Sequence, residues 1–503
     1  MSFLLGVDAG TTSLKVGLYD RTGRELATAG AEYRLSTPEP AWVELDPELY
    51  WSALANAVHN VLAAAAASGR DVAAMAVSSQ GETVLPVSRA GEALAPAIVW
   101  LDNRAVEEAR EIGGLLDDAT VYEATGIPTV VPTWPACKIL WWKRHAPEIF
   151  EAASHFLLVE EYLLHRLTGR FVGEGGVQST SLLYDIVHHD WWQPALEILG
   201  VTPCHFGELV LPGEVLGTLT ASAAETLGLT TAVRVAAGGM DQSVGAVGVG
   251  NVAPGILSES TGGALTLQAS IGRADDDRSR QTPVYVHSAP ALYLYCPVCP
   301  TGGMTLTWFR DNFGEREMFC AAAAGMSAYD LLTELAAKVP PGSDGLTMLP
   351  HLSGAFSPEY EPTARGVFFG FTLGHGRGHF VRAILEAVAF MLRRNMELLE
   401  GIGAGAGEIR SHGGGAKSAL WGQIKADVCS LPVVTLSGTE AAVRGDAMLA
   451  GVASGAFGDL GEACVAMVQP ASRFEPDQAT RAVYEVAYRR YIDLFETVRP
   501  LFC

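Results

Sequence analysis

The first residues able to do chemistry lie close to the start of the chain. An apolar run over 4–7 ends at Asp8, a small-residue turn follows over 9–13, and a second alternating run begins at Leu14. This pattern predicts a β-hairpin with a carboxylate and a Gly/Thr/Ser turn at its tip. Amides and hydroxyls of such a turn can cradle phosphate, and a neighbouring Asp can hold Mg²⁺. The alternative is an ordinary hairpin with a polar tip.

A similar pattern begins again near the middle of the chain. A glycine-rich stretch over 238–250 is followed over 255–267 by strand, small-residue turn and strand. Two hairpins of one shape predict a duplicated α/β domain with a cleft between the copies. Two phosphate loops facing that cleft would hold a polyphosphate from both sides.

A third glycine-rich turn precedes a predicted helix late in the sequence. Gly413–Gly415 leads into a helix over 418–429, where a base or ribose could approach the backbone closely. The alternative is a flexible connection. Ala416 before Lys417 breaks the Walker A spacing, and no G-x-G-x-x-G follows a strand, which argues against a dinucleotide-binding dehydrogenase.

Alternating strand and helix patterns position these turns. Asp46 and Pro47 are typical of a helix start, with Asp46 as N-cap. The predicted helices are 46–67, 103–115, 139–145, 159–167 and 380–399, and the predicted strands include 72–78, 83–87 and 408–411.

Composition limits the classes of protein that fit. With 503 residues, two or more domains are expected, and the formal charge of −22 argues against nucleic acid and anionic membranes as partners. The start lacks the basic region of a signal peptide, and no apolar run is long enough to span a membrane. We therefore expect a soluble, cytoplasmic protein. Cys296 and Cys299 form a lone C-x-x-C, expected to be reduced core thiols rather than a redox or zinc site.

Together these motifs resemble the FGGY carbohydrate kinases over nearly the whole chain. The segment 8–13 resembles their first phosphate loop, and 239–242 resembles the segment that carries their catalytic Asp. Gly366–Phe371 is similar to a recurrent family signature, except that Phe371 replaces the usual aliphatic residue. The segment 413–418 resembles the adenosine-binding segment.

The resemblance implies an α/β fold of two actin-like/ribonuclease-H-like domains flanking a nucleotide cleft. Residues 1–251 would bind the sugar and carry the catalytic Asp and the first phosphate loop. Residues 252–503 would carry the second phosphate loop and the adenosine site. It also implies ATP and Mg²⁺ as cofactors, a small neutral sugar or polyol as substrate, and a homodimer.

Two segments bear on the substrate. The segments 349–354 and 362–366 look most like xylulokinases, which usually carry Gln-Met-His-Gly where this chain has Gln80-Gly81-Glu82-Thr83. That segment is more similar to the Gln-Arg-Glu-Thr of glycerol kinases, but Gly81 replaces the Arg. The resemblance therefore implies phosphorylation of a ketopentose such as xylulose, with glycerol or a tetritol as alternative acceptors. A nucleotide-gated ATPase of the actin and heat-shock chaperone superfamily, with no sugar acceptor, is a further alternative.

The resemblance also assigns roles to single residues. Asp241 would be the general base, with a turn-capping Asp as the alternative, and Asp8 and Asp241 would lie near the metal. Lys15 would contact phosphate or be a solvated hairpin residue. The nucleotide would be contacted by Gly10, Thr11, Thr12, Ser13, Lys15, Thr261, Gly262, Gly303, Thr307, Gly414, Gly415 and Ser418.

The acceptor would be bound by residues that follow a predicted strand. Glu82 would accept hydrogen bonds from vicinal hydroxyls, and Trp100 would offer an apolar face to a sugar edge. Gln80, Gly81 and Asp241 complete the predicted acceptor site. Asp102 and Arg104 are open to two interpretations, a contribution to this site or a structural ion pair.

Overall fold

The chain divides into two compact units, and the second half of the sequence contributes to both. The computed structural model describes residues 2–274, 280–438 and 440–502. The first unit comprises Met1–Val252, Ile271–Leu294 and Glu440–Gln469; the second comprises Ala253–Ser270, Tyr295–Thr439 and Pro470–Cys503. The sequence-based division between residues 251 and 252 lies next to the first junction but has no counterpart for the two segments that return to the first unit.

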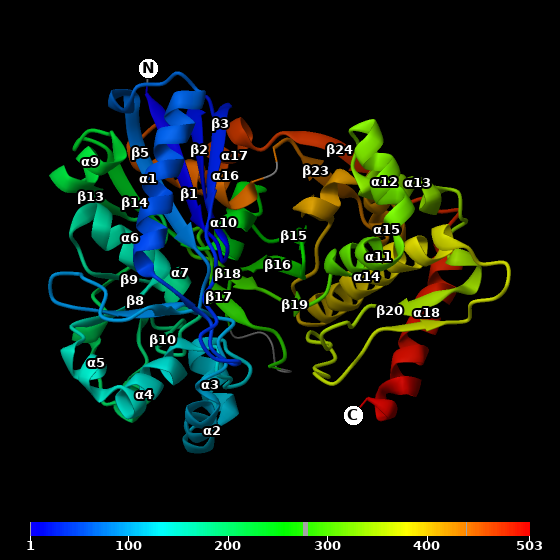
Figure 1. Ribbon diagram of the computed structural model, residues 1–503, viewed down its shortest axis with the longest axis horizontal. Coiled ribbons are helices and arrows are strands. Elements are labelled where there is room, and N and C mark those ends of the chain that lie inside the picture. Colours follow the sequence, from blue (N-terminus) through cyan, green and yellow to red (C-terminus); the bar gives the residue numbers. More distant parts are fainter. Residues whose placement is uncertain (1, 275–279, 439, 503) are drawn as a thin grey trace. The chain divides into compact units, whose positions relative to one another are not determined.

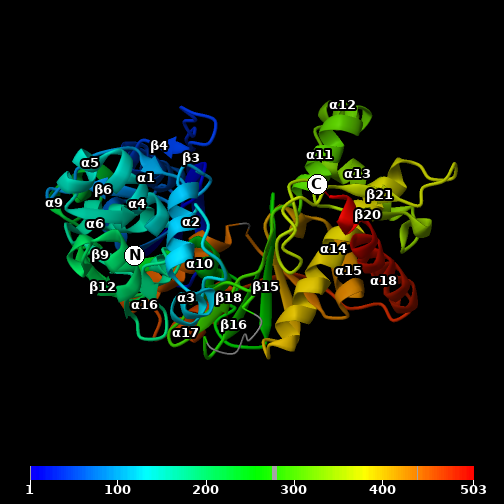
Figure 2. The same cartoon turned by 90° about the horizontal axis from the view of Figure 1, so that it is seen from below.

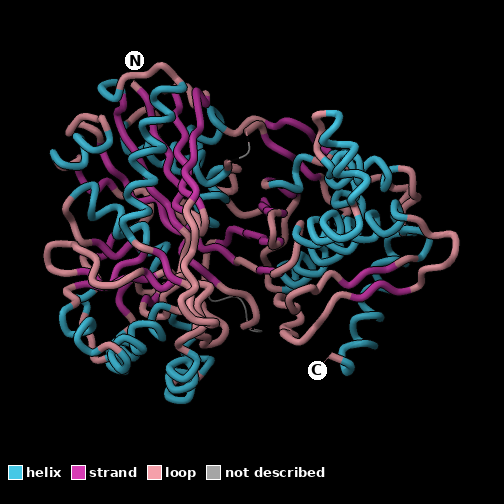
Figure 3. The backbone as a smooth tube through the Cα atoms, viewed as in Figure 1, coloured by secondary structure: helices cyan, strands magenta, loops and turns pink. Residues whose placement is uncertain are grey.

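A six-stranded sheet forms the centre of the first unit, in the order β13-β14-β5-β1-β2-β3 (Figures 1 and 3). β5 runs parallel to both β1 and β14, whereas β2, β3 and β13 join their neighbours antiparallel. The predicted opening hairpin is therefore present as β1 and β2. The strands are β1 (Phe3–Ala9), β2 (Ser13–Asp20), β3 (Glu25–Glu32), β5 (Val72–Ser79), β13 (Val215–Thr218) and β14 (Arg234–Met240).

Helices cover both faces of this sheet because its central strands are apolar on both sides. On β1, Leu5 and Val7 join the core formed with α1, α6 and α9, whereas Leu4 joins the core formed with α10, α16 and α17. These helices are α1 (Pro47–Ala64), α6 (Val159–Thr168), α9 (Ala221–Leu227), α10 (Asp241–Gly248), α16 (Ala441–Ser454) and α17 (Leu460–Met467).

The first helix shows how local sequence sets an element's limits. The Asp46 side chain accepts a hydrogen bond from the Glu48 amide at 3.0 Å, and Pro47 occupies the first turn, so the predicted start is confirmed. The helix ends at Ala64, three residues before the predicted end. Ala66 takes a left-handed backbone conformation with φ of 49°, which terminates the helix.

The remaining elements of the first unit build smaller layers beside the sheet. β4, β7, β6 and β8 form a four-stranded sheet, β9 pairs with β12 and β10 with β11, and β17 pairs with β18 as part of a larger sheet. The strands are β4 (Glu44–Leu45), β6 (Val84–Val87), β7 (Ala97–Ile98), β8 (His155–Leu158), β9 (Val172–Glu174), β10 (Tyr184–Asp185), β11 (Asp190–Trp191), β12 (Glu208–Val210), β17 (Val284–Val286) and β18 (Tyr293–Tyr295). The helices are α2 (Val106–Leu115), α3 (Asp118–Thr125), α4 (Pro135–His145), α5 (Pro147–Ala152), α7 (Gly175–Gln178) and α8 (Gln193–Leu199), with 3₁₀ turns η1 (Gly69–Asp71) and η2 (Pro203–His205).

The second unit repeats the central motif of the first. β15 and β16 form an antiparallel hairpin, β22 runs parallel to β15, β23 runs parallel to β22, and β24 closes the edge antiparallel. This matches the hairpin and parallel neighbour of β1, β2 and β5, and it confirms the predicted second hairpin. These strands are β15 (Ile256–Thr261), β16 (Leu265–Ile271), β22 (Glu408–His412), β23 (Val433–Leu436) and β24 (Pro470–Phe474).

The helices of the second unit include the neighbours α14, α15 and α18 (Figure 2). They are α11 (Met304–Phe313), α12 (Glu315–Ala324), α13 (Ala328–Ala337), α14 (Arg377–Gly401), α15 (Ala419–Cys429) and α18 (Arg481–Val498), with 3₁₀ turns η3 (Ser343–Gly345), η4 (Gly414–Lys417) and η5 (Arg499–Leu501). The strands β19 (Val298–Cys299), β20 (Thr347–Leu349) and β21 (Val367–Phe369) complete it. Cys296 and Cys299 are buried and are not joined in a disulfide bond. Across the described residues, no helix has the length and apolarity needed to cross a membrane.

Replacing Gly6 by Ala is expected to destabilise the protein. An added Cβ would lie 1.9 Å from the carbonyl oxygen of Val443, at the start of α16. Relieving that overlap must push α16 away from β1, and overpacking of this kind costs about 1–3 kcal/mol. The thermal unfolding midpoint of the full chain measures the loss.

Gly114→Ala provides the matched control, because no atom lies within 4 Å of a Cβ added at this position in α2. Ala is favoured over Gly by up to about 1 kcal/mol at helical positions, and Gly114 is in the last turn of α2, so this variant should melt at or slightly above the wild-type temperature. A Gly6→Ala protein as stable as the wild type would contradict the close packing of α16 on β1.

Candidate active site

The candidate site lies where three parallel strands of the first unit end together. In the strand register, Ser79 of β5 is opposite both Ala9 of β1 and Met240 of β14. Asp8 therefore lies at this edge, and Asp241, the first residue of α10, follows Met240 directly. The carboxyl edge of parallel strands is where ligands bind in open α/β sheets. The fold thus brings together residues that are far apart in the sequence.

The carboxylates at this edge influence one another. Burial, and then the negative charge of Asp8, raise the pKa of Asp241 well above its ordinary value, with a further contribution from Glu82. Burial also raises the pKa of Asp8 to about 6, although the ammonium of Lys15 opposes the shift. The Asp241 carboxylate accepts a hydrogen bond from the Gln242 amide at 2.7 Å. A buried acid of raised pKa is a stronger base toward a hydroxyl proton.

Asp8 also has the character of a magnesium ligand. Its Oδ1 is buried and accepts no hydrogen bond from the described residues, and leaving a carboxylate oxygen in this state costs free energy that a cation would recover. Among the described residues, no three or more His, Cys, Asp or Glu side chains form a metal cage. Mg²⁺ is commonly held by one or two carboxylates together with phosphate oxygens, so the donors present fit this ion.

The tip of the opening hairpin contains the predicted phosphate contacts. The turn is closed by a hydrogen bond from the Gly10 amide to the Ser13 carbonyl at 3.0 Å, which leaves Thr12 exposed. The Thr11 hydroxyl accepts a hydrogen bond from the indole of Trp100 at 3.0 Å, so Trp100 adjoins this turn. The ammonium of Lys15 is paired at 2.6 Å with Glu440, the residue that directly precedes α16.

The predicted acceptor segment directly follows β5. Gln80 is buried and donates to the Tyr50 hydroxyl at 2.9 Å. Any side chain at position 81 would place its Cβ 2.8 Å from the Thr180 Oγ1, so the backbone here has room only for glycine. Glu82 has a positive φ of 56°, and its amide donates to the same Thr180 oxygen at 3.1 Å. Such a conformation in a residue other than glycine is often found at functional sites.

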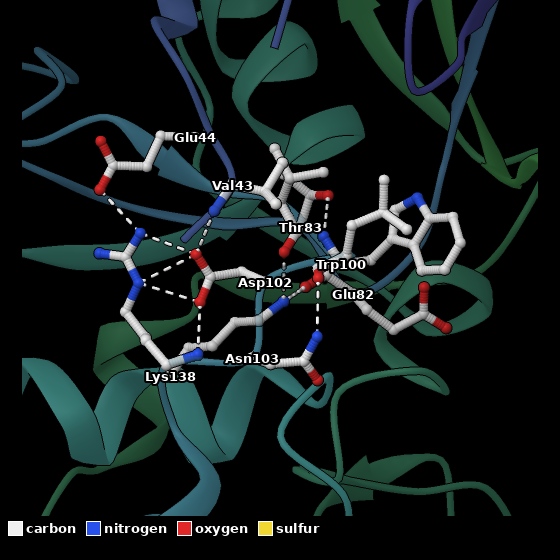
Figure 4. Close-up of polar contacts among 11 residues, drawn as sticks. Val43, Glu44, Glu82, Thr83, Trp100, Asp102, Asn103 and Lys138 are labelled. Atoms are coloured by element: carbon white, nitrogen blue, oxygen red, sulfur yellow. Dashed lines mark hydrogen bonds and ion pairs between the residues drawn. The ribbon is translucent and has the colours of Figure 1, made fainter. Parts of the chain in front are cut away.

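A buried lysine that the sequence analysis missed supports this segment (Figure 4). The ammonium of Lys138, in α4, donates to the carbonyls of Glu82 at 2.8 Å and Val99 at 3.1 Å. Burial lowers the pKa of Lys138 to about 7, against the opposing effects of the acids Glu82 and Asp102. Burial likewise raises the pKa of Glu82 to about 7, and Lys138 opposes that shift. The available signal was a single Lys within the apolar helical run 136–142.

Asp102 and Arg104 form a structural ion pair, which is one of the two interpretations left open by the sequence. The guanidinium of Arg104 lies 2.8 Å from Asp102 and 2.7 Å from Glu44, and it stacks on the ring of Trp42. Asp102 also accepts a hydrogen bond from the Val43 amide at 2.6 Å (Figure 4). These contacts join the segment that follows Trp100 to residues 42–44.

A β-bulge aims Asp241 into the site, and a buried glutamate holds the bulge. The register between β14 and β5 shifts at Gly238, and Gly239 has a φ of 121°. The Glu160 carboxyl accepts hydrogen bonds from the amides of Gly238 at 2.9 Å and Gly239 at 3.1 Å. Bulges of this type commonly redirect a side chain beside an active site.

Glu160 has a second buried acid as its neighbour. Burial, and then the charge of Glu174, raise the pKa of Glu160 well above its ordinary value. Glu174 accepts hydrogen bonds from the amides of Gly176 at 2.8 Å and Val177 at 2.7 Å, and burial raises its pKa to about 7. Burial and the neighbouring Glu174 therefore both disfavour the charged form of Glu160. Sequence analysis missed it because two adjacent glutamates at a helix start are usually solvated.

In the second unit, the predicted nucleotide contacts collect around the turn after β15. Gly303 packs so closely that an added Cβ would lie 2.5 Å from the carbonyl oxygen of Gly262, which places the start of α11 on this turn. The amide of Gly262 is bonded to the carbonyl of Ala264 at 3.0 Å. Thr307 lies one helical turn after Gly303, and its hydroxyl is 2.8 Å from the Tyr329 hydroxyl.

The glycine turn before α15 packs against Thr261, the last residue of β15, and so against the same turn. A Cβ added at Gly415 would lie 2.7 Å from the Cβ of Thr261, and Gly414 precedes it in η4. Ser418 caps α15, accepting a hydrogen bond from the Trp421 amide at 3.3 Å. The predicted phosphate turn and the predicted adenosine turn of this unit are therefore in direct contact.

Comparison with known proteins identifies the fold and the family. The FGGY family of carbohydrate kinases matches residues 3–248 with its N-terminal domain and residues 262–454 with its C-terminal domain. The gluconokinase of Bacillus subtilis (strain 168) is 28% identical over 494 residues, which cover 98% of this chain and 95% of that protein. The xylulose kinase of the same strain is 27% identical over 508 residues, covering 100% and 98%. The crystal structure of ligand-bound xylulose kinase from Lactobacillus acidophilus has a TM-score of 0.89 at 25% identity, covering 100% of this chain and 99% of the other. With both domains matched in order, this chain belongs to the FGGY family of carbohydrate kinases and has their two-domain fold.

Proposed function

We propose that this kinase transfers the terminal phosphoryl group of ATP to a hydroxyl of a small neutral sugar or polyol, with a ketopentose such as xylulose as the first candidate. The observation that carries the proposal is the convergence of Asp241, Asp8 and the segment 80–82 at one edge of the sheet. Similarity to xylulose kinases supports a ketopentose. The Gln-x-Glu-Thr segment supports glycerol or a tetritol as the alternative.

Asp241 is suited to the role of general base. Phosphoryl transfer requires mainly that the attacking hydroxyl be positioned and its proton accepted as the new bond forms. The raised pKa of Asp241 makes its carboxylate a better proton acceptor than a solvated one. Mg²⁺, when bound near Asp8, would neutralise charge on the phosphate oxygens.

The charges around the acceptor segment favour a neutral substrate over an aldonate such as gluconate. Asp8, Glu82 and Asp241 place three acids at this edge. The ammonium of Lys138 donates to backbone carbonyls, and that of Lys15 is paired with Glu440. A carboxylate on the substrate would therefore be repelled, whereas hydroxyls could donate to Glu82.

In each unit, separate groups would contact the nucleotide. In the first unit these would be the hydroxyls of Thr11, Thr12 and Ser13 and the amides of the turn other than that of Gly10, which donates to the Ser13 carbonyl. In the second unit, the start of α11 at Gly303 adds the favourable end of a helix dipole to the turn at Gly262. Gly414, Gly415 and Ser418 would border the adenosine.

The proposal is tested by measuring ADP release with Mg·ATP in the presence of xylulose, ribulose, glycerol, erythritol and gluconate. A neutral acceptor should accelerate release strongly, whereas gluconate should not. Glu82→Gln should raise the KM of that acceptor by about tenfold to a hundredfold, since hydrogen bonds to a charged group are lost. Preference for gluconate would contradict the neutral-substrate proposal.

Asp241→Asn should lower kcat by about 10²- to 10⁴-fold, because the proton acceptor is lost. Asp446→Asn is the matched control. Asp446 is another buried acid, bonded to the Ser78 hydroxyl at 2.6 Å, and Asn retains an acceptor for that bond. The control should keep most of the wild-type kcat. Equal losses in the two variants would argue against Asp241 as the base.

Glu160 is expected to act by positioning Asp241, through its acceptor oxygen rather than its charge. Glu160→Gln retains a carbonyl oxygen for the amides of Gly238 and Gly239 and should keep nearly full kcat. Glu160→Leu removes that oxygen and should lower kcat by up to about 10²-fold, as expected for a small displacement of a reacting group. Steady-state kinetics at saturating ATP measures both. Inactivity of Glu160→Gln in a folded protein would show that the charge is required.

A further inference from the structure

A charged pair is completely buried in the second unit, next to the turns proposed to hold the nucleotide. The ammonium of Lys425, in α15, lies 2.6 Å from the carboxylate of Glu259, in β15, and both side chains have 0% exposure. The same ammonium lies 5.2 Å from the ring centroid of Trp421, on its own helix. Burying two charges this deeply costs much of the free energy gained from their attraction. Replacing a buried ion pair by apolar residues of similar size often leaves stability unchanged or raises it, so stability is a weak explanation for this pair.

Thr261 joins the pair through its hydroxyl. It accepts a hydrogen bond from Lys425 at 2.8 Å and donates one to the other oxygen of Glu259 at 2.7 Å. Ser411, on the neighbouring strand β22, also donates to Glu259. The hydroxyl of Thr261 is therefore engaged inside the unit, and its residue is 1% exposed. A ligand at this turn would meet backbone groups and not this hydroxyl.

Thr261 in turn supports both glycine turns. It is the last residue of β15 and begins the turn that contains Gly262. Its side chain is also the surface on which Gly415 rests, since a Cβ added at Gly415 would lie 2.7 Å from that of Thr261. Gly413 approaches the Thr261 carbonyl in the same way, at 3.3 Å from an added Cβ. Thr261 thus contacts the turn at 413–415 with both its side chain, at Gly415, and its carbonyl, at Gly413.

We propose that the buried Lys425–Glu259 pair is a positioning device for nucleotide binding, which holds Thr261 and, through it, the two glycine turns in the arrangement that accepts the nucleotide. This inference rests on the proposed function, because it assumes that these turns contact the nucleotide. Glycine turns have few side-chain contacts of their own, so their geometry must be imposed by a neighbour. Charged hydrogen bonds impose it more narrowly than apolar packing, because they are directional.

The test replaces both charges at once, so that no unpaired charge is left in the interior. Lys425→Met combined with Glu259→Leu should raise the KM for Mg·ATP and the Kd for Mg·ADP by about tenfold, while the KM for the acceptor changes less than about twofold. An unchanged KM for Mg·ATP in a folded double variant would overturn the inference.

A second buried ion pair in the same unit supplies the control. Arg382 and Glu386 of α14 are 2.9 Å apart, with side-chain exposures of 7% and 3%. Their other partners include the Tyr484 hydroxyl and the Ser343 hydroxyl. Arg382→Met with Glu386→Leu should change the melting temperature but leave the KM for Mg·ATP near the wild-type value. If both double variants raise that KM equally, the effect is one of general stability and the inference fails.

Thr261→Val provides a test that keeps the ion pair intact, for use if the double variant does not fold. Thr261→Val should weaken Mg·ADP binding. Thr261→Ser, which keeps the hydroxyl, should bind Mg·ADP with an affinity close to that of the wild type. Wild-type affinity in Thr261→Val would overturn the inference. Wild-type protein is measured first: if it neither binds Mg·ADP nor turns over Mg·ATP, the proposed function fails and this inference fails with it.

Discussion

The arrangement of the first unit depends on the parallel register of β5 between β1 and β14. Because Ser79 is opposite both Ala9 and Met240, the three strands end at the same level and their following residues share one edge. A slip of one residue would turn Asp8 toward the opposite face. The glycine at position 6 belongs to this constraint, since only the absence of a side chain lets α16 lie against β1. The packing of α16 against β1 therefore helps to fix the position of the strand edge where Asp8 and Asp241 lie.

The electrostatics of the edge follow from that geometry. Burial raises the cost of ionising Asp8, Glu82 and Asp241, and strands that end together add the charges of Asp8 and Glu82 to the cost at Asp241. The ammonium of Lys138 donates its hydrogen bonds to backbone carbonyls. Its charge therefore lowers the free-energy cost of ionising Glu82 without a hydrogen bond to the Glu82 carboxylate. The edge is left rich in acceptors. Such a site suits donors, namely hydroxyls and a hydrated or phosphate-bound cation.

Much of this organisation could be predicted from the sequence, because it is local. The hairpins, the cap at Asp46 and the turn before α15 depend on residues that are neighbours in the chain, and the structure contains them. Residues that act through distant partners were not predictable. Glu160 meets Gly238, and Lys425 meets Glu259, only after folding, and a Glu or Lys in a helix is ordinarily solvated. The return of α16 to the first unit was missed for the same reason, since its partner β1 lies at the other end of the chain.

The missed residues have a common physical origin. Loops that approach a ligand through their backbone must be built from small residues, and small residues provide little packing to hold them. In both units, a buried acid accepts hydrogen bonds from a glycine segment or from the residue next to it. Glu160 binds the amides of the bulge before Asp241, and Glu259 binds the Thr261 hydroxyl beneath the glycine turns. The two acids differ in how their charge is compensated. Burial and then the charge of Glu174 raise the pKa of Glu160, which has no cationic partner among the described residues, whereas Glu259 has Lys425 as a counter-ion. A glycine loop is therefore only as well positioned as the buried polar group behind it, and that group can lie anywhere in the sequence.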